Sequence, residues 1–134
     1  MQILPVIDLK DGEVVRGVAG QRSTYQPVQS LLASAATVTA VATAFATQLP
    51  VDTIYVADLN AIAGEEPNWQ ALDQISATGL DIWLDAGVGD LSRAEQLSRY
   101  AQQQPQLTSV IIGLESVPDA ETLQKLWNQL GRER

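Results

Sequence analysis

The sequence contains no cysteine and no histidine. It therefore cannot build a thiolate zinc site, a thiol nucleophile, an imidazole base or a Ser-His triad. Any acid–base chemistry must fall to carboxylates, to lysines such as Lys10 and Lys125, or to tyrosines. Without cysteine, the redox compartment is left undecided.

Positive charge is also scarce, because 8 Lys and Arg stand against 16 Asp and Glu, a net charge of −8. This balance argues against duplex nucleic acid as a partner. There is no basic amphipathic helix, and no apolar run approaches the ~20 residues that span a membrane. Met1 and Gln2 lead straight into an apolar stretch without a basic segment or a small-residue cleavage site. We therefore expect a cytoplasmic protein with no membrane partner.

What the chain does contain is enough apolar material for one core, since 46% of its 134 residues are hydrophobic. We expect a single domain over residues 1–134. Residues 19–37 are small and polar, with no sustained period, and are expected to form a mobile loop.

The opening stretch places one carboxylate at the end of an apolar strand. Residues 3–7 are apolar apart from Pro5, which predicts a short strand buried on both faces, as in parallel sheets. Asp8 then lies at the carboxyl end of that strand, where parallel α/β folds keep their chemistry. Asp11-Gly12 is a tight-turn dipeptide, so residues 13–18 should return as the second strand of a hairpin. Asp8 could equally be a strand-capping residue that bonds nearby backbone N–H groups.

Downstream, strands and helices alternate. Apolar runs predict strands over residues 53–57, 80–84 and 107–112, and helical spacing predicts helices over 38–50, 67–79, 91–101 and 118–131. Ser92 and Glu95 are spaced as a capping box for the third helix. Trp69 and Trp127 lie on the apolar faces of their helices, which predicts that both are core residues.

The strand ends repeat along the chain. Asp58, Asp85 and Gly113 follow successive strands at spacings of 27 and 28 residues. A repeat of this length that holds one strand and one helix is a β/α unit. We therefore predict an α/β fold of four β/α units with a hairpin after the first strand, forming half of a TIM (β/α)8 barrel. An open doubly wound sheet is disfavoured, because no glycine-rich phosphate loop follows the first strand.

Such a half-barrel leaves one sheet face uncovered and its outer strand edges unpaired. The uncovered residues would be Leu4, Val6, Tyr55, Trp83 and Ile111, or their neighbours on the other side of the pleat. We therefore expect self-association to a homo-oligomer, or a partner that supplies a missing C-terminal half-barrel.

The stretch Ile-Leu-Pro-Val-Ile-Asp-Leu-Lys-Asp-Gly-Glu-Val-Val-Arg-Gly, residues 3–17, closely resembles the opening of the histidine-biosynthesis barrel enzymes (HisA/HisF-like). These are the phosphoribosylformimino-aminoimidazole carboxamide ribotide isomerase and its cyclase relative. The likeness continues at Tyr-Val-Ala-Asp-Leu, residues 55–59, and more loosely to the end of the chain. It implies a (β/α)8 barrel of twofold internal symmetry, of which this chain resembles the amino-terminal half.

The resemblance also implies roles for individual residues. The family isomerase converts an aminoaldose to an aminoketose (an Amadori rearrangement), and by position Asp8 matches its catalytic base. The partner carboxylate lies on the fifth strand of the family, so we expect no turnover from this chain alone. Arg16, Asp58 and Asp85 are candidate substrate-binding residues, and the backbone N–H groups of Gly87 and Gly113 are candidates for phosphate binding. The expected ligand is a phosphorylated sugar or a similar small molecule, with no cofactor.

The sequence departs from the family pattern at the third and fourth strand ends. Residues 85–89 are Asp-Ala-Gly-Val-Gly rather than a glycine triplet followed by Ile-Arg, and Gly113 is followed by Leu114 rather than Thr or Ser. Asp85 and Glu115 would each repel a phosphate dianion by about a kcal/mol at partly screened distances. Two alternatives therefore stay open: a divergent HisA-like barrel of one-carbon cofactor biosynthesis (tetrahydromethanopterin or methylofuran type), and a non-catalytic half-barrel assembly unit.

Two further assignments concern the rim of the predicted barrel. Asp58, Asp85 and Glu115 offer hard oxygen ligands of the kind magnesium prefers, but strand-end carboxylates more often bond neighbouring loops, and we expect no metal. Arg16 and Lys10 are the cations nearest the rim, and substrate contact and simple solvation are equally compatible with the sequence.

Overall fold

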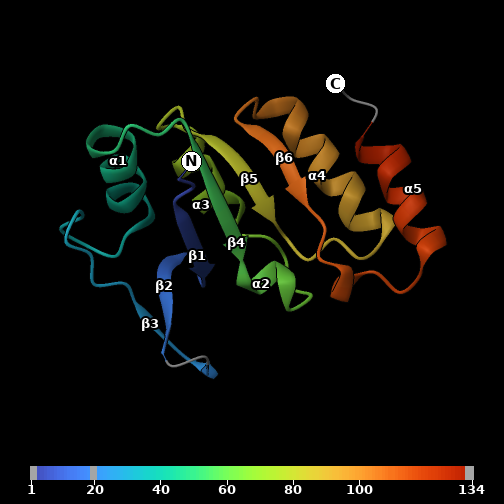
Figure 1. The fold of residues 1–134 in the computed structure, drawn as a ribbon, viewed down its shortest axis with the longest axis horizontal. Coiled ribbons are helices and arrows are strands. Elements are labelled where there is room, and N and C mark those ends of the chain that lie inside the picture. Colours follow the sequence, from blue (N-terminus) through green and yellow to red (C-terminus); the bar gives the residue numbers. More distant parts are fainter. Residues whose placement is uncertain (1–2, 19–20, 132–134) are drawn as a thin grey trace.

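The computed structural model describes residues 3–18 and 21–131. Its described strands form one sheet in the order β3-β2-β1-β4-β5-β6 (Figure 1). The strands are β1 (Val6–Lys10), β2 (Glu13–Val18), β3 (Gln21–Pro27), β4 (Thr53–Asp58), β5 (Asp81–Asp85) and β6 (Leu107–Ile111). β1, β4, β5 and β6 run parallel, and β2 and β3 add antiparallel to the outer side of β1.

The described helices are α1 (Val38–Gln48), α2 (Leu59–Ile62), α3 (Trp69–Ser76), α4 (Leu91–Gln103) and α5 (Ala120–Leu130), with a 3-10 turn η1 (Leu114–Ser116) after β6. Helices α1 to α4 lie between successive parallel strands, with α2 directly after the end of β4, and α5 follows β6 and packs against α4; the longer helices lie on one side of the sheet. Fully buried side chains alternate along the parallel strands and form a core with the helices. On β1, β4 and β5 these are Ile7, Leu9, Ile54, Val56, Ile82 and Leu84. This arrangement confirms the predicted α/β fold of β/α units, a partial TIM barrel.

The opposite face of the sheet carries the alternate residues and lacks a helical layer among the described residues. Val6 is 57% exposed and Trp83 is 37% exposed on this open face. The expectation that the first strand is buried on both faces is therefore wrong. A parallel strand is buried on both sides only where a second layer covers it, and here the helices cover one side.

Strand β1 also begins and ends later than expected. It starts at Val6 and continues to Lys10, so Asp8 lies within the strand and pairs in register with Ala57 of β4. The hairpin explains the extension, because β2 pairs with β1 from Asp8 to Lys10. Asp11 and Gly12 form the tight turn with φ values of 52° and 79°, a conformation that Asp-Gly tolerates well.

Part of the expected loop over 19–37 is a strand. β3 pairs antiparallel with β2, through partners such as Arg16 with Gln26. Residues 19 and 20 lie outside the described residues, and the mobility of the segment stays a prediction. Its polar sequence concealed the strand, because a sheet edge with two solvated sides needs no apolar alternation.

Helix starts differ from the sequence prediction in detail. Asp90, not Ser92, caps α4, because its carboxylate accepts a 2.9 Å hydrogen bond from the Arg93 N–H. Asp119 caps α5 in the same way, through the Thr122 N–H.

Trp127 on α5 is 69% exposed, so its assignment to the core is wrong. The reason is that the sheet beneath α5 ends at β6.

Candidate active site

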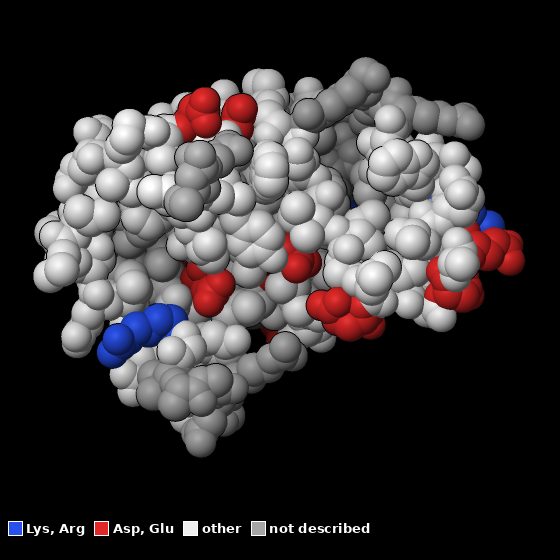
Figure 2. Space-filling view, in the orientation of Figure 1, with Lys and Arg blue, Asp and Glu red and all other residues white. Residues whose placement is uncertain are grey.

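The carboxyl ends of the four parallel strands form a rim on the open face. In register across the sheet, Asp8 of β1 pairs with Ala57 of β4, Ala57 with Asp85 of β5, and Asp85 with Ile111 of β6. The carboxylates of Asp8 and Asp85 thus lie two strands apart, with the small side chain of Ala57 between them. The backbones of their two strands are about 10 Å apart. Figure 2 shows acidic side chains near the middle of this face and basic ones only towards its edges.

Asp8 is half-buried on this rim. Burial raises the pKa of its carboxyl above the ordinary aspartate value, because a partly desolvated carboxylate is less stable in its charged form. A carboxyl shifted in this direction is better placed to exchange protons near neutral pH. The structure thus gives Asp8 the environment of an acid–base group.

Tyr55 lies one row deeper on the same face, in register with Val6 and Trp83. Its hydroxyl donates a 3.1 Å hydrogen bond to Asp85 Oδ2. Burial and the nearby carboxylates of Asp85, Asp8 and Glu115 raise the pKa of Tyr55 to about 12, so it stays a protonated donor. Our sequence prediction did not include Tyr55 in the site. The signal was its position two residues before Ala57, which puts both on one strand face.

Asp85 is held from two sides. One oxygen, Oδ2, accepts the Tyr55 bond, and the other, Oδ1, accepts a 3.1 Å bond from the Gly87 N–H. The carboxylate therefore has a fixed orientation on the rim, and Gly87, a predicted phosphate donor, already gives its N–H to Asp85.

Asp58 is fully buried and offers no surface to a substrate. Its Oδ1 accepts hydrogen bonds from the Ala61 N–H and from Asn68 Nδ2, and its Oδ2 accepts a 2.6 Å bond from the Asn68 N–H. The carboxylate thus caps α2 and closes the segment between β4 and α3. The structure supports a positioning role for Asp58 rather than the predicted substrate contact.

Two asparagines, both missing from the sequence prediction, extend this network to the hairpin. Asn60 Oδ1 accepts a 2.8 Å bond from the Asp11 N–H, and Asn68 Oδ1 accepts a 3.0 Å bond from the Gly12 N–H. Asn68 Nδ2 also donates to Asn60 Oδ1. The hairpin turn is thereby tied to the segment after β4. No sequence spacing signals this link, because its partners are 49 and 56 residues apart.

Gly113, the second predicted phosphate residue, lies under a carboxylate. A Cβ built on Gly113 would meet the Glu115 carboxylate oxygens at 2.7 and 2.8 Å, so Glu115 folds back onto this glycine. Both predicted phosphate positions therefore have an acidic side chain beside them. Phosphate binding by Gly87 and Gly113 stays a prediction.

The two cationic residues of the hairpin, Lys10 and Arg16, point to opposite faces of the sheet. Arg16 is exposed on β2, next to Val15, the residue that pairs with Asp8. Because neighbouring residues on a strand point to opposite faces, the side chain of Arg16 faces away from that of Asp8. Lys10 is on the Asp8 side of the pleat, with its Nζ 5.7 Å from the centre of the Tyr25 ring. Lys10 is thus the better placed of the two to reach a ligand on the rim.

Within residues 3–18 and 21–131, no cluster of three acidic residues is arranged to hold a metal ion. Asp58 is fully used by its hydrogen bonds, which leaves Asp8, Asp85 and Glu115 as the acidic residues of the rim. In the same part of the chain, no helix is long and apolar enough to cross a bilayer.

Comparison with known proteins identifies relatives of this arrangement. Residues 2–134 match the family model described as "Histidine biosynthesis protein". An uncharacterised protein of Methanocaldococcus jannaschii is 31% identical over 125 residues, which cover 93% of this chain and 53% of the relative. Isomerases named for a phosphoribosylated imidazole-4-carboxamide are similar as well. The one from Sinorhizobium fredii is 36% identical over 89% of this chain and 44% of the relative. The one from Desulfitobacterium hafniense is 31% identical over 98% and 49%, respectively.

The chain spans about half the length of the curated relatives it matches. The family match covers every parallel strand and the described rim. The resemblance inferred from residues 3–17 and 55–59 is thereby confirmed, and the chain belongs to the histidine biosynthesis protein family.

Proposed function

We propose that the rim around Asp8 is the amino-terminal part of an isomerase site that converts an aminoaldose to an aminoketose. The main support is the carboxyl group of Asp8, which is half-buried, has a raised pKa and lies on the rim of the parallel strands. In addition, the named relatives of the chain include isomerases. By the same likeness, the substrate would be a phosphoribosyl imidazole-carboxamide intermediate of histidine biosynthesis. We also propose a cytoplasmic location.

The proposed reaction moves protons within one substrate. An acid first protonates the ribose ring oxygen, which opens the ring to an imine. A base then removes the proton from carbon two, and the resulting enolamine becomes the aminoketose once carbon one is protonated. Asp8 is proposed as the base, a role that commonly contributes about 10²–10⁴-fold in rate.

The described residues supply only part of this chemistry. Tyr55 holds its proton too tightly to act as the acid at neutral pH, and Asp85 is engaged by Tyr55 and Gly87. We therefore propose that the second acid–base group comes from further β/α units beyond β6, and that the 134-residue chain alone is inactive.

A complementation assay tests this proposal. The chain is mixed with a separately produced C-terminal half of the Desulfitobacterium hafniense isomerase, association is checked by sedimentation, and conversion of the aminoaldose is followed. We expect turnover only in the mixture, and a loss of about 10²-fold or more with Asp8→Asn. Lys125→Gln, on the outer helix α5, is the control and should leave the rate unchanged. Turnover by the chain alone at an ordinary enzymatic rate, or an associated Asp8→Asn mixture that is fully active, would contradict the proposal.

A second candidate rests on the acidic rim. Glu115 lies against Gly113, and Asp85 accepts the Gly87 N–H, so both predicted phosphate positions carry negative charge. This arrangement favours a cationic amine over a phosphate, as expected for a divergent HisA-like barrel of one-carbon cofactor biosynthesis. Calorimetric titration with ribose 5-phosphate and with a primary alkylamine, which is cationic at neutral pH, separates the candidates. Binding of the phosphate supports the isomerase, and binding of the amine alone supports the divergent barrel.

A further inference from the structure

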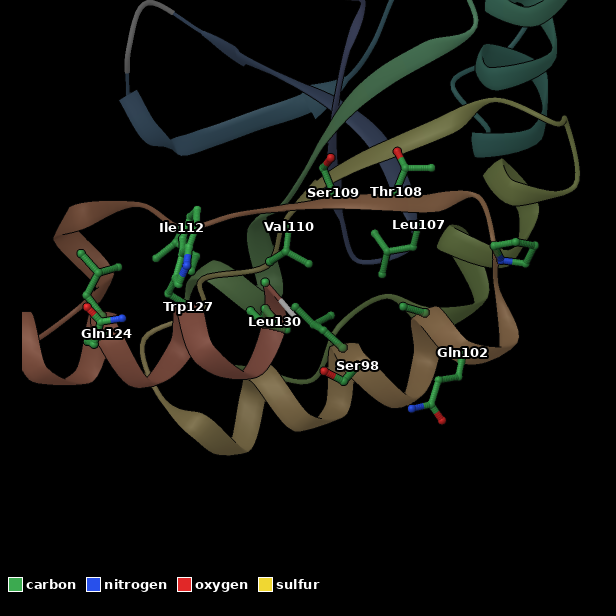
Figure 3. Close-up of a pocket in the computed structure, with 15 residues that line it drawn as sticks. Ser98, Gln102, Leu107, Thr108, Ser109, Val110, Ile112, Gln124, Trp127 and Leu130 are labelled. Carbon is green, nitrogen blue, oxygen red and sulfur yellow. The ribbon is translucent and has the colours of Figure 1, made fainter. Parts of the chain in front are cut away.

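A groove opens on the helical side of the sheet, beyond its last parallel strand. It has a volume of about 1230 Å³ and lies between β6, α4 and α5 (Figure 3). Val110 and Ile112 form its floor, and Trp127 and Leu130 project into it from α5 (Figure 3). Trp127 is 69% exposed, a large apolar surface for a single side chain.

The groove adjoins an unpaired strand edge. β6 is the last strand of the sheet and pairs only with β5 in the part of the chain that the structure describes. Its outer N–H and C=O groups are thus free to pair with another strand, and apolar surface lies beside them. The other edge strand, β3, is polar and ends in Pro27, which lacks an N–H. The β6 edge is therefore the one suited to association.

A buried hydroxyl in the groove wall lacks a partner. Ser98 of α4 is 8% exposed, lines the groove, and its Oγ makes no hydrogen bond in the described structure. Buried polar groups in native proteins are nearly always satisfied, since an unmet hydroxyl costs about 1–3 kcal/mol. An occupant that brings polar atoms to the groove would satisfy it.

The charge distribution fits a copy of the same chain. Two molecules that each carry a net charge of −8 repel one another over most of their surfaces. The residues that line the groove include no Asp, Glu, Lys or Arg. A second copy brings the same uncharged surface, a free strand edge and an exposed Trp127, and a twofold contact requires such a self-complementary patch.

We propose that the groove between β6, α4 and α5 is the contact surface of a symmetric dimer, in which the β6 edges and Trp127 side chains of two copies meet. This contact leaves the rim residues uncovered, since the groove lies on the helical side of the sheet and the rim lies on the open face, but it uses the β6 edge at which further β/α units would also pair.

Sedimentation equilibrium of the 134-residue protein across the micromolar range tests the dimer. We expect a monomer–dimer equilibrium that Trp127→Glu weakens by at least about tenfold, or 1.4 kcal/mol. Leu31→Glu is the matched control, because it adds the same charge at a fully exposed apolar residue outside the groove. It should leave the dissociation constant unchanged. Far-UV circular dichroism of both variants verifies that they are folded.

A wild-type chain that stays monomeric throughout this range would overturn the proposal. So would a dimer that a folded Trp127→Glu variant forms with unchanged affinity, because the two copies would then meet elsewhere, for example through the open face. The dimer is measured on the 134-residue chain without the C-terminal half of the complementation assay, because that half would compete with a second copy for the β6 edge.

Discussion

At the scale of single residues, the two aspartates that follow neighbouring strands have different environments. Asp8 lies half-buried on the open face, whereas Asp58 is fully buried and held by Ala61 and Asn68. The sequence presents both as a carboxylate after an apolar run. The difference depends on Asn68, ten residues after Asp58, whose backbone and side-chain N–H groups both reach the buried carboxylate.

The raised pKa of Asp8 makes a prediction about stability and pH. Because the folded protein binds the Asp8 proton more tightly than the unfolded chain, stability from this group is full below the ordinary aspartate pKa of about 4 and is lost as the pH rises through the folded-state value. Asp8→Asn lacks this loss. Urea unfolding at a series of pH values should therefore show the variant gaining stability relative to wild type between acidic and neutral pH. A difference that stays flat or falls would be inconsistent with the burial of Asp8.

At the scale of elements, the periodic helices and apolar strands follow from the sequence, but their ends do not. Helical spacing from Val38 predicts α1, since burial of one face against the sheet requires that spacing. The capping box of Ser92 and Glu95 was misleading because Asp90, two residues earlier, is also a strong N-cap residue. β3 was missed because both of its sides tolerate polar residues.

The competition between the two caps can be measured. Asp90→Ala should lower the free energy of unfolding by about 1 kcal/mol, because it removes the hydrogen bond to the Arg93 N–H. Ser92→Ala, which has no capping role in the structure, should change it by less than about 0.5 kcal/mol. Denaturant unfolding of both variants gives the comparison. The reverse order of effects would restore Ser92 as the cap.

At the scale of the whole molecule, the count of β/α units determines what is left open. Four parallel strands with helices on one side cannot enclose the residues of the other side, so Val6 and Trp83 stay exposed. The repeat of strand ends made this face predictable. The groove beside α5 was not predictable, because helical spacing puts Trp127 on an apolar face but does not show that the sheet beneath it ends.

The open face should bind an apolar dye. We expect the uncharged dye Nile red to fluoresce with the native chain, since a net charge of −8 would repel the usual anionic dyes. Trp83→Glu, in the middle of this face, should reduce the signal, and Leu31→Glu should not. Native protein that gives no more signal than buffer would show that the open face is covered in solution.

Gly87 and Gly89 determine how closely the loops at the rim pack against one another. A side chain on Gly89 would meet the Ser116 carbonyl oxygen at 2.1 Å, and one on Gly87 would meet Ile62 Cα at 2.7 Å. At each of these glycines, the backbones of two successive loops are in contact. The loops after β4, β5 and β6 therefore pack directly against one another. Enlarging either glycine would displace its neighbour and carry Glu115 or α2 outward. The positions of Glu115 and α2 at the rim therefore depend on two residues that bear no charge, and an alanine at Gly87 or Gly89 would shift them without replacing a carboxylate.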